Sequence, residues 1–387
     1  MRVALINSYA GSLLIAAKQE GHEVIGSLED KGYGLGCQRL NYPDVSYTAA
    51  PPWPELDLSD ALCLGHPPCS CFSVQGGGAK DKSKRGIDSE AFKSSRMAIE
   101  YALERRAKAL AVESVTATLE GARSYHDEVA EDYGYHLYRV LQNAISFGLP
   151  QWRPRFWAIF VRKNLGLPEK MWFHHQPVFR TVGECLEGIT PGETIRGAQT
   201  YYDKNLKRFA ERGLDLKKIL GQDDTYSNVA YLAARYLNLV DAGMSRTGAE
   251  IRFREKYGIP TGFHVSWLCT LNPGGFAGTV MSDSHWCLGD RLLTRPEYCA
   301  IAGFPPDYKF DKPNEARAYL SRGVAPPVAR WILCQVVTHL EGSFDPAKVT
   351  AITDKYIQAQ PGETVDFRVS KAELKQMKLF DLDRGEA

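Results

Sequence analysis

Short apolar segments alternate with helical stretches through the first 161 residues, and this alternation limits the fold more than any other feature. Helical periodicity is expected over 13–19 and 89–108. Strands that alternate with helices predict an α/β fold with a parallel sheet. Ligands of such sheets bind beyond the carboxyl ends of the strands, so residues that follow strands are the functional candidates. Five segments read as buried strands: 2–6, 24–28, 60–64, 109–112 and 157–161.

The composition is that of a folded protein with balanced charge. Hydrophobic residues make up 44% of the 387 residues, which is enough for a sizeable core and excludes disorder as the main state. The 47 Lys and Arg residues nearly equal the 46 Asp and Glu residues. This balance excludes a protein coated in positive charge but leaves room for a local basic groove.

Nothing in the sequence indicates a membrane span, a signal peptide or a disulfide framework. The sequence has no apolar run of about 18 residues, the length that a span needs. Its nine cysteines are odd in number and irregularly spaced, which favours a reduced, cytoplasmic compartment. Cys69 and Cys71 form the one close pair, and no second Cys or His pair accompanies them, so no metal site is expected.

Reactive or charged side chains follow several of the predicted strands. Cys69 comes after two prolines just beyond strand 60–64, and Glu113 follows strand 109–112. Arg153 and Arg155 lie two residues apart on an extended segment, so their side chains point to the same side. Taken singly, each has an ordinary structural interpretation: an inert buried thiol, an ion pair, or a surface salt bridge.

Taken together and in this order, the motifs resemble the DNA (cytosine-5)-methyltransferase family. The resemblance spans residues 1–330 and rests on ordered blocks, each of which is weak alone. The blocks are Tyr9-Ala-Gly11, Pro67-Pro-Cys69, Glu113-Ser-Val115, Asn143 to Arg155, Arg291 to Tyr308, and Val324-Ala-Pro-Pro-Val-Ala329. The resemblance implies a Rossmann-like fold that uses S-adenosylmethionine, with an inserted, largely helical target-recognition domain.

The resemblance also assigns chemistry to the candidate residues. Cys69 would add to C6 of a cytosine flipped out of double-stranded DNA and so make C5 nucleophilic. Glu113 would hydrogen-bond N3 and the exocyclic amine. Arg155 would bind O2, while Arg153 would support the site or contact a phosphate. Two rival hypotheses are a non-catalytic DNA-binding relative and an RNA-directed relative; the presence of Cys69, Glu113 and Arg155 favours an enzyme over the first.

The same resemblance indicates where the cofactor would lie. Glu29 ends the second strand, where an acidic residue binds ribose hydroxyls in Rossmann-like sites. Asp44 is expected at the adenine amine. The full set of expected cofactor contacts is Tyr9, Ala10, Gly11, Glu29, Asp44, Gly65, Pro67, Arg322 and Gly323.

Several positions depart from the family pattern, and one of them bears on the cofactor. Asn7, Ser70 and Ser114 replace the family's Asp, Gln and Asn, and Ser321-Arg322 replaces Gly-Asn. Arg322 is expected beside the methionine part of the cofactor, which already carries two cations. The guanidinium of Arg322 would be a third cation at this position, and burying it is costly unless an anion pairs with it. Carboxy-S-adenosylmethionine, whose extra carboxylate suits a bidentate interaction, is therefore an alternative cofactor, and carboxymethylcytosine the alternative product. The other possibility is that Arg322 turns away to a nearby acid or a DNA phosphate.

The expected domains follow from these blocks and from changes in composition. Residues 1–180 and 288–345 would form the catalytic domain and 181–287 the target-recognition insertion. The basic residues of this insertion could contact DNA phosphates or, because acidic residues lie among them, form an ordinary solvated helical surface. Pro361-Gly362 would link a tail, 346–387, in which Gln376, Leu379 and Phe380 resemble the peptide that binds the bacterial sliding clamp. The alternative is an amphipathic terminal helix that packs on the domain. The chain is expected to act as a monomer in a bacterial cell or as a phage protein inside one. The basic residues of the target-recognition insertion that could contact DNA phosphates are Lys204, Lys207, Arg208, Lys217, Lys218, Arg246, Arg252 and Arg254.

Overall fold

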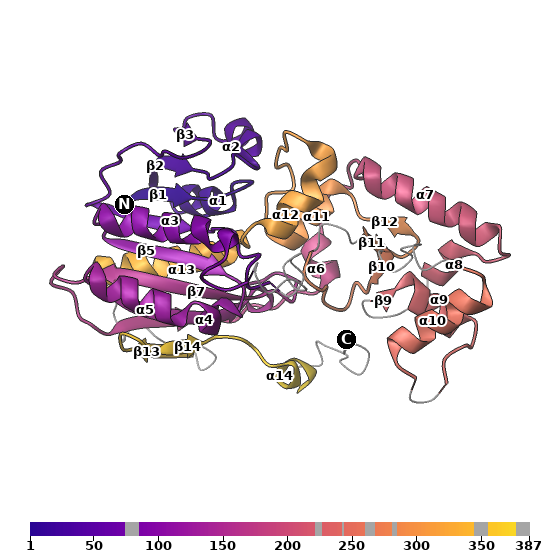
Figure 1. Cartoon of the computed structure of the whole chain (residues 1–387). Helices are drawn as coiled ribbons and strands as arrows, with labels where there is room; N and C mark the ends of the chain where they lie inside the picture. Colours follow the sequence, from indigo (N-terminus) through magenta and orange to yellow (C-terminus); the bar gives the residue numbers. More distant parts are fainter. Residues whose placement is uncertain are drawn as a thin grey trace.

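Two sheets lie towards opposite ends of an elongated molecule in the computed structural model (Figure 1). The small lobe is defined as residues 181–292, and the other described residues form the large lobe. The described parts of the chain are residues 1–73, 85–220, 227–241, 244–259, 268–280, 285–343 and 355–376.

The large lobe is built on an eight-stranded sheet with the order β14-β6-β7-β5-β4-β1-β2-β3. Most neighbours are parallel, but β7 runs antiparallel to both β5 and β6. The strands are β1 (Arg2–Ile6), β2 (Glu23–Leu28), β3 (Tyr47–Thr48), β4 (Ala61–Gly65), β5 (Ala109–Ser114), β6 (Tyr135–Asn143), β7 (Pro154–Arg162) and β14 (Thr364–Asp366).

The sheet is therefore mixed, whereas the sequence predicted a parallel one. The reason is the short connection 144–153 between β6 and β7. A parallel pair needs a crossover of a dozen or more residues, but a short connection can reverse the chain. The reversal has a functional consequence, because the start of β7 then meets the carboxyl ends of β4 and β5.

Helices cover both faces of the large sheet. Helices α1 (Ser12–Gln19) and α13 (Pro326–Leu340) pack on one face, and α3 (Glu90–Glu104) and α5 (Arg123–Asp132) pack on the other (Figure 1). Alternate residues of one strand enter the two cores, as Leu5 and Ile6 do. Coverage of both faces explains why the central strands are almost wholly apolar and were recognisable in the sequence. The α/β expectation is confirmed.

The small lobe combines helices with a four-stranded sheet of order β12-β11-β10-β9. It is rich in helix, as expected, but the sheet was not predicted, and it continues beyond the expected boundary at 287 to Leu292. Its core contains Phe209, Phe253 and Trp286. The elements are α6 (Val182–Leu186), α7 (Arg196–Ala210), α8 (Leu216–Leu220), β9 (Ser227–Asn228), α9 (Val229–Tyr236), α10 (Arg246–Lys256), β10 (Leu268–Leu271), β11 (His285–Leu288) and β12 (Arg291–Leu292).

Two helices join the lobes through one continuous core. Helices α11 (Arg295–Ala302) and α12 (Ala316–Arg322) lie between the sheets in Figure 1. Their buried residues belong to the hydrophobic cluster that contains Phe253 of the small lobe and Ala10 of the first loop of the large lobe. The small lobe and the first loop of the large sheet thus share one hydrophobic core, to which α11 and α12 also contribute. The remaining elements are α2 (Leu35–Asn41), α4 (Thr118–Gly121), 3₁₀ turns at Ala144–Ser146 and Pro313–Glu315, β8 (Met171–His175), β13 (Lys355–Ala359) and α14 (Lys371–Gln376).

The C-terminal segment packs on the large lobe where the sequence predicted a linker and tail. Strand β13 pairs with β8, and β14 extends the large sheet beside β6. Gly362 lies in the turn between them, and its carbonyl accepts a 2.8 Å hydrogen bond from the buried Arg139. Leu374 of α14 is buried against Ile145 and Phe276. Pro361-Gly362 is a turn rather than a linker, because backbone pairing on both sides fixes it.

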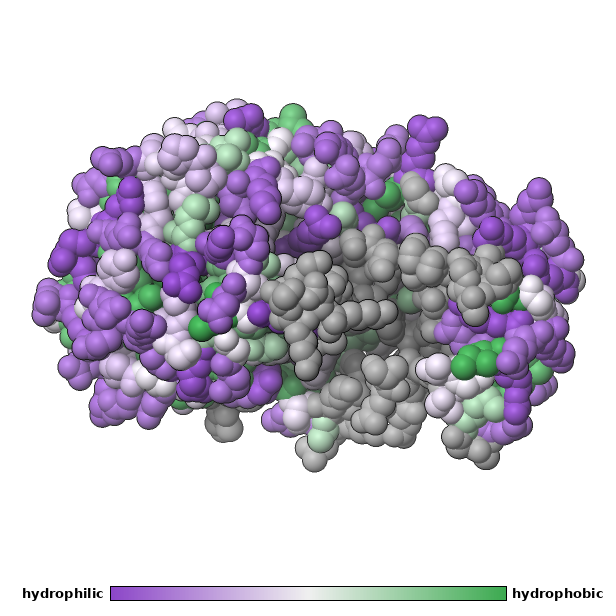
Figure 2. Space-filling model, viewed as in Figure 1, coloured by the Kyte–Doolittle hydropathy of each residue, from purple (hydrophilic) through white to green (hydrophobic). Residues whose placement is uncertain are grey.

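The face drawn in Figure 2 is mainly hydrophilic over both lobes, with scattered hydrophobic residues. Among the described residues, no helix is both long and apolar enough to cross a membrane.

Candidate active site

The predicted catalytic residues meet at one edge of the large sheet. Cys69 lies just beyond β4, Glu113 is the penultimate residue of β5, and Arg155 is the second residue of β7. Strands β4 and β5 are parallel and β7 is antiparallel to β5, so two carboxyl ends and one amino end come together. Register supports this placement, since Glu113 pairs with Trp157 and Gly65 with Val112.

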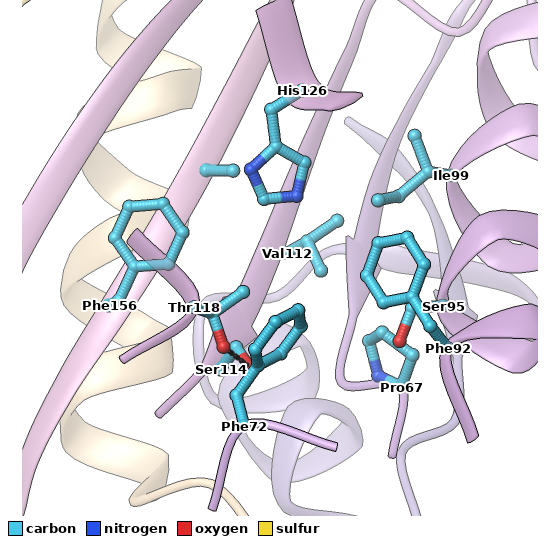
Figure 3. A pocket seen from close by; sticks show the side chains of 11 residues that line it. Pro67, Phe72, Phe92, Ser95, Ile99, Val112, Ser114, Thr118, His126 and Phe156 are labelled. Atoms are coloured by element: carbon cyan, nitrogen blue, oxygen red, sulfur yellow. Dashed lines mark hydrogen bonds between the residues drawn. The ribbon is translucent and has the colours of Figure 1, made fainter. Parts of the chain in front are cut away.

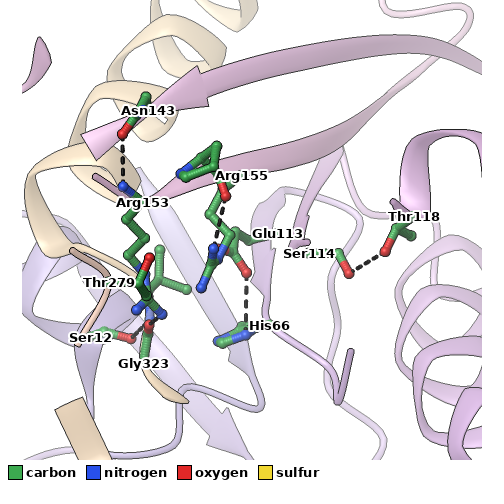
Figure 4. A network of polar contacts seen from close by, with 12 residues as sticks. Ser12, His66, Glu113, Ser114, Thr118, Asn143, Arg153, Arg155, Thr279 and Gly323 are labelled. Carbon is green, nitrogen blue, oxygen red and sulfur yellow. Dashed lines mark hydrogen bonds and ion pairs between the residues drawn. The ribbon is translucent and has the colours of Figure 1, made fainter. Parts of the chain in front are cut away.

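Glu113 is buried between two nitrogen-bearing side chains. Its Oε1 lies 3.0 Å from Nε of Arg155, and its Oε2 lies 3.2 Å from Nε2 of His66 (Figure 4). The side chain of Glu113 is only 1% exposed. A carboxylate so deeply buried needs such partners, because an unpaired buried charge is strongly disfavoured.

Arg153 joins the site to the end of α12. Its backbone N–H donates to Oδ1 of Asn143 over 2.8 Å, and its Nη2 donates to the carbonyl of Gly323 (Figure 4). The same Nη2 also donates to the carbonyl of Ser321 over 3.1 Å. Burial lowers the pKa of Arg153 to about 9, and Arg155 adds to the effect. This placement favours support of the site over contact with a DNA phosphate, because the side chain is buried against backbone carbonyls.

Cys69 is only partly exposed and carries a thiol rather than a thiolate at rest. Burial raises the pKa of Cys69, and the nearby Glu113 raises it further, while Arg155 and Arg153 act in the opposite direction. Behind Pro67 lies a small internal cavity, lined by Phe72, Ser114 and His126 among others (Figure 3). Ser114, where the family has Asn, hydrogen-bonds Thr118 there over 2.7 Å.

The first loop follows β1 and has an unusual backbone. Asn7 and Tyr9 both adopt positive φ, of 56° and 51°, and Gly11 has φ of 90°. A Cβ on Gly11 would lie 2.5 Å from the hydroxyl of Tyr308, which donates a hydrogen bond to the carbonyl of Ala10. The late block that ends at Tyr308 therefore fixes the loop at Tyr9, Ala10 and Gly11.

Glu29 has one oxygen satisfied and one unpaired. Its Oε1 accepts hydrogen bonds from the backbone N–H of Tyr9 at 3.1 Å and from Nε2 of Gln38 at 2.7 Å. Its Oε2 is buried without a partner. Burial holds the pKa of Glu29 well above its usual value. An unpaired carboxylate oxygen here fits a ligand that brings hydroxyl donors, as a ribose does.

Asp44 does not lie at this site, so the expected contact with adenine is corrected. Its carboxylate pairs at 2.7 Å with Lys18, near the end of α1. Helix α1 begins at the first loop and runs away from the carboxyl edge, and its eight residues span about 12 Å. The end of β3, at Thr48, lies at the carboxyl edge instead.

Arg322 lies beside the first loop. Its guanidinium carbon is 4.9 Å from the centre of the Tyr33 ring, and its charge acts on Tyr9. It forms no ion pair with any carboxylate in the described parts of the chain. Gly323, the next residue, is buried, with Ser12 close to it. Gly65 and Pro67 are also buried, at the end of β4.

Three contributors escaped prediction from the sequence. His66 stands within the Gly-His-Pro-Pro-Cys block, yet its contact with Glu113 appears only when β4 and β5 pair. Gln38 of α2 reaches Glu29, and Asn143 reaches Arg153. A histidine next to the Pro-Pro-Cys motif was the one signal that could have been used. No group of three or more His, Cys, Asp or Glu side chains suited to a metal ion occurs in the described ranges.

Comparison with known proteins gives consistent results. The orphan methyltransferase M.SPRI of Bacillus phage SPR is 25% identical over 238 residues, which cover 56% of this chain and 51% of that protein. The type II methyltransferase M.XorII of Xanthomonas oryzae is 26% identical over 205 residues, covering 48% and 46%. The chain thus spans about half the length of these curated relatives.

Solved structures share the fold. A prophage-encoded E. coli protein described as a DNA modification methyltransferase has a TM-score of 0.58 at 16% identity, with 88% of this chain and 99% of that chain covered. The Entamoeba histolytica methyltransferase EhMeth has a TM-score of 0.54 at 11% identity, with 89% and 99% covered. At such identities the likeness establishes a shared Rossmann-like fold and nothing finer.

The model of the family called C-5 cytosine-specific DNA methylase matches residues 6–338, a span that contains the first loop, Cys69, Glu113, the two arginines and the late block. Because this match runs through most of the chain, the protein belongs to the C-5 cytosine-specific DNA methylase family.

Proposed function

We propose that the chain is a DNA (cytosine-5)-methyltransferase that modifies a flipped cytosine through a covalent bond to Cys69. The observation that carries the proposal is the buried Glu113, paired with Arg155 beside Cys69. A non-catalytic DNA-binding relative would have no need to maintain a buried charge next to a thiol, because that arrangement costs stability.

Glu113 is suited to move the proton that the addition requires. Because Cys69 rests as a thiol, its proton has to leave as sulfur bonds to C6. The C5–C6 π electrons then move towards C4 and N3, and N3 takes up a proton. Glu113 accepts the thiol proton and delivers it to N3, so charge and protons balance. Arg155 stays beside Glu113 and binds O2 of the base.

The residues around the first loop fit S-adenosylmethionine. The unpaired Oε2 of Glu29 would accept hydrogen bonds from the ribose hydroxyls, and Tyr9, Ala10 and Gly11 would lie along the cofactor. When bound, the cofactor supplies an electrophilic methyl group on a sulfonium. Double-stranded DNA would lie between the large lobe, which holds the cytosine, and the small lobe, which would recognise the target sequence.

The test is mass spectrometry of nucleosides after incubation of double-stranded DNA with the protein and S-adenosylmethionine. The expected product is 5-methylcytosine. Unmodified DNA from folded, cofactor-binding protein would favour the non-catalytic relative. Methylation of a structured RNA in a parallel reaction, without methylation of DNA, would favour the RNA-directed relative.

Arg322 supports a second candidate, transfer of a carboxymethyl group from carboxy-S-adenosylmethionine. Its guanidinium lies at the first loop beside Tyr9 and Tyr33, without a carboxylate partner in the described structure. An extra carboxylate on the cofactor would supply one. The two cofactors should compete on one DNA, with Arg322→Asn alongside. Transfer of methyl alone by the wild type, unchanged in Arg322→Asn, would eliminate the carboxymethyl candidate.

A further inference from the structure

His66 lies between the first loop and Glu113. It directly follows β4, and its backbone N–H continues the sheet by donating to the carbonyl of Ile6 over 2.9 Å. The residue is 4% exposed. Its ring meets the ring of Tyr9 edge-on, with centroids 5.1 Å apart, and its Nε2 lies 3.2 Å from Oε2 of Glu113 (Figure 4).

The two oxygens of Glu113 have separate partners, and only one partner carries a permanent charge. Arg155 holds Oε1 at 3.0 Å and supplies the positive charge that balances the carboxylate. His66 holds Oε2. A nitrogen lies within 3.2 Å of each oxygen, but neither oxygen has a hydrogen-bond partner in this structure, so the lone pairs of Glu113 remain available for the thiol and the base.

The surroundings of His66 favour a neutral ring. Burial lowers the pKa of His66 to about 4; Glu113 opposes this effect, while Arg153 and Arg155 reinforce it. The titratable and charged groups that face the pair are Cys69 after β4, Tyr9 after β1, and Arg153 and Arg155 at the start of β7. A neutral imidazole has one N–H, and a carboxylate can only accept, so a hydrogen bond from His66 to Glu113 requires that N–H on Nε2. The other ring nitrogen, Nδ1, is buried without a partner.

We propose that His66 is a positioning residue for Glu113: its Nε2–H, on the side opposite Arg155, holds the carboxylate in one orientation and keeps it anionic, ready to take the Cys69 proton. This inference rests on the proposed function, because it gives Glu113 the role of moving that proton. Removal of the donor takes away one interaction that favours the anion of Glu113 over its protonated form. The acidic limb of the pH–rate profile then moves upward.

The most specific test compares two variants, His66→Gln and His66→Asn, whose amide side chains differ only in length. In His66→Gln the amide nitrogen can occupy the position of Nε2 and still donate to Glu113. In His66→Asn it is one bond shorter and corresponds to Nδ1. The rate of covalent trapping on a duplex that contains 5-fluorocytosine is measured from pH 5.5 to 8.5 for both variants. A charge-assisted hydrogen bond of this kind corresponds to about tenfold or more in rate.

We expect His66→Asn to trap DNA about tenfold more slowly than the wild type, with its acidic limb at higher pH. His66→Gln should stay within about threefold of the wild type and keep the wild-type limb. Cofactor affinity and thermal unfolding should be similar in both. If His66→Asn folds poorly, His66→Phe, which keeps a buried ring and lacks the donor, takes its place. His22→Phe, at the opposite end of the sheet before β2, is the matched control and should be unchanged.

Each outcome decides one question. A wild type that folds and binds cofactor but traps and methylates no DNA contradicts the proposed function itself. An active wild type together with an unaffected His66→Asn rate and pH profile overturns the positioning role alone. Equal losses in His66→Gln and His66→Asn also overturn it, because the donor would then not be what matters.

Discussion

The two lobes differ in whether they bury ionisable side chains such as Glu and Arg. The large lobe buries Glu29, Glu113, Arg139 and Arg153 almost completely. In the described part of the small lobe the buried polar residues are neutral: Asn205, Thr270 and His285, whose pKa burial lowers to about 3. Burying a charge is costly, so it indicates either a structural pairing or chemistry. Arg139 makes a structural pairing. Glu29, Glu113 and Arg153 instead lie together at one edge of the sheet, as residues involved in chemistry would.

The basic residues of the small lobe lie on ordinary surface helices beside its sheet. On α7, Tyr202 and Phe209 face the core while Lys204, Lys207 and Arg208 are exposed. On α10, Arg252 is paired with Asp241 at 2.5 Å and Arg254 with Glu250 at 2.7 Å, so some expected DNA-contacting cations already have acidic partners. The contrast predicts that changes in the large lobe affect chemistry and changes in the small lobe affect DNA binding.

The largest effect is expected from Cys69→Ser. Without the thiol, covalent trapping on DNA that contains 5-fluorocytosine should disappear, and methyl transfer should fall by at least about a thousandfold. Gel electrophoresis under denaturing conditions detects the trapped complex. Cys185→Ser, in the small lobe, is the matched control and should trap normally. A covalent complex that persists in Cys69→Ser would assign the nucleophile to another residue.

Phe253→Ala should destabilise the small lobe and leave the cofactor site of the large lobe unaffected. Phe253 is fully buried and packs against Phe209 with ring centroids 5.9 Å apart. Its loss should destabilise the small lobe by about 3–5 kcal/mol. Calorimetric titration should then show weakened DNA binding with cofactor affinity retained. Equal loss of both would mean that the core shared through α11 and α12 couples the lobes too tightly for the comparison to hold.

Stability should fall in mild acid because of buried neutral histidines in both lobes. Burial lowers the pKa of His66 to about 4, and that of His126 and His285 to about 3. Below an unfolded-state pKa of about 6.5 the unfolded chain takes up protons that the folded chain does not, so stability is lost as pH falls towards 4. Urea unfolding at pH 7 and pH 5 should differ by about 1–2 kcal/mol per histidine. His126→Phe should reduce that difference; an unchanged difference would contradict this explanation.

Removal of the exposed cations of α7 should weaken DNA binding moderately. The triple variant Lys204→Ala, Lys207→Ala, Arg208→Ala should lose about tenfold in affinity at 0.1 M salt. The slope of log affinity against log salt should flatten by about 2 to 3, because each phosphate contact contributes about 0.9. Fluorescence anisotropy over a salt series measures both. Lys163→Ala, whose lysine pairs with Glu131 in the large lobe, should leave the slope unchanged.

The smallest effect on catalysis is expected at the C-terminus. Gln376 ends α14, and Leu379 and Phe380 lie outside the described residues. Gln376→Ala with Leu379→Ala should abolish capture of the bacterial sliding clamp in a pull-down and leave methylation of a short duplex unchanged. Failure of the intact chain to retain clamp would end the docking hypothesis.

Five of the eight strands of the large sheet could be predicted from the sequence, whereas β3, β6 and β14 were not predicted; the sequence also supplied the candidate reactive residues. Strands such as β1 and β4 are covered on both faces, so they are continuous apolar runs that can be recognised without a structure. Cys69, Glu113 and Arg155 follow or begin such runs. The end of a strand is a local feature of the sequence, so its position can be predicted without a structure.

The partners of these residues could not be predicted from the sequence, because they depend on how distant strands pair. The reversal of β7 brings Arg155 to Glu113, and the pairing of β4 with β5 brings His66 to the same carboxylate. Asp44 pairs with Lys18 and so lies away from the site. The segment expected to be a tail, 346–387, contributes β14 to the large sheet. These outcomes depend on pairings between segments far apart in the chain, and no local pattern of residues encodes strand order or direction.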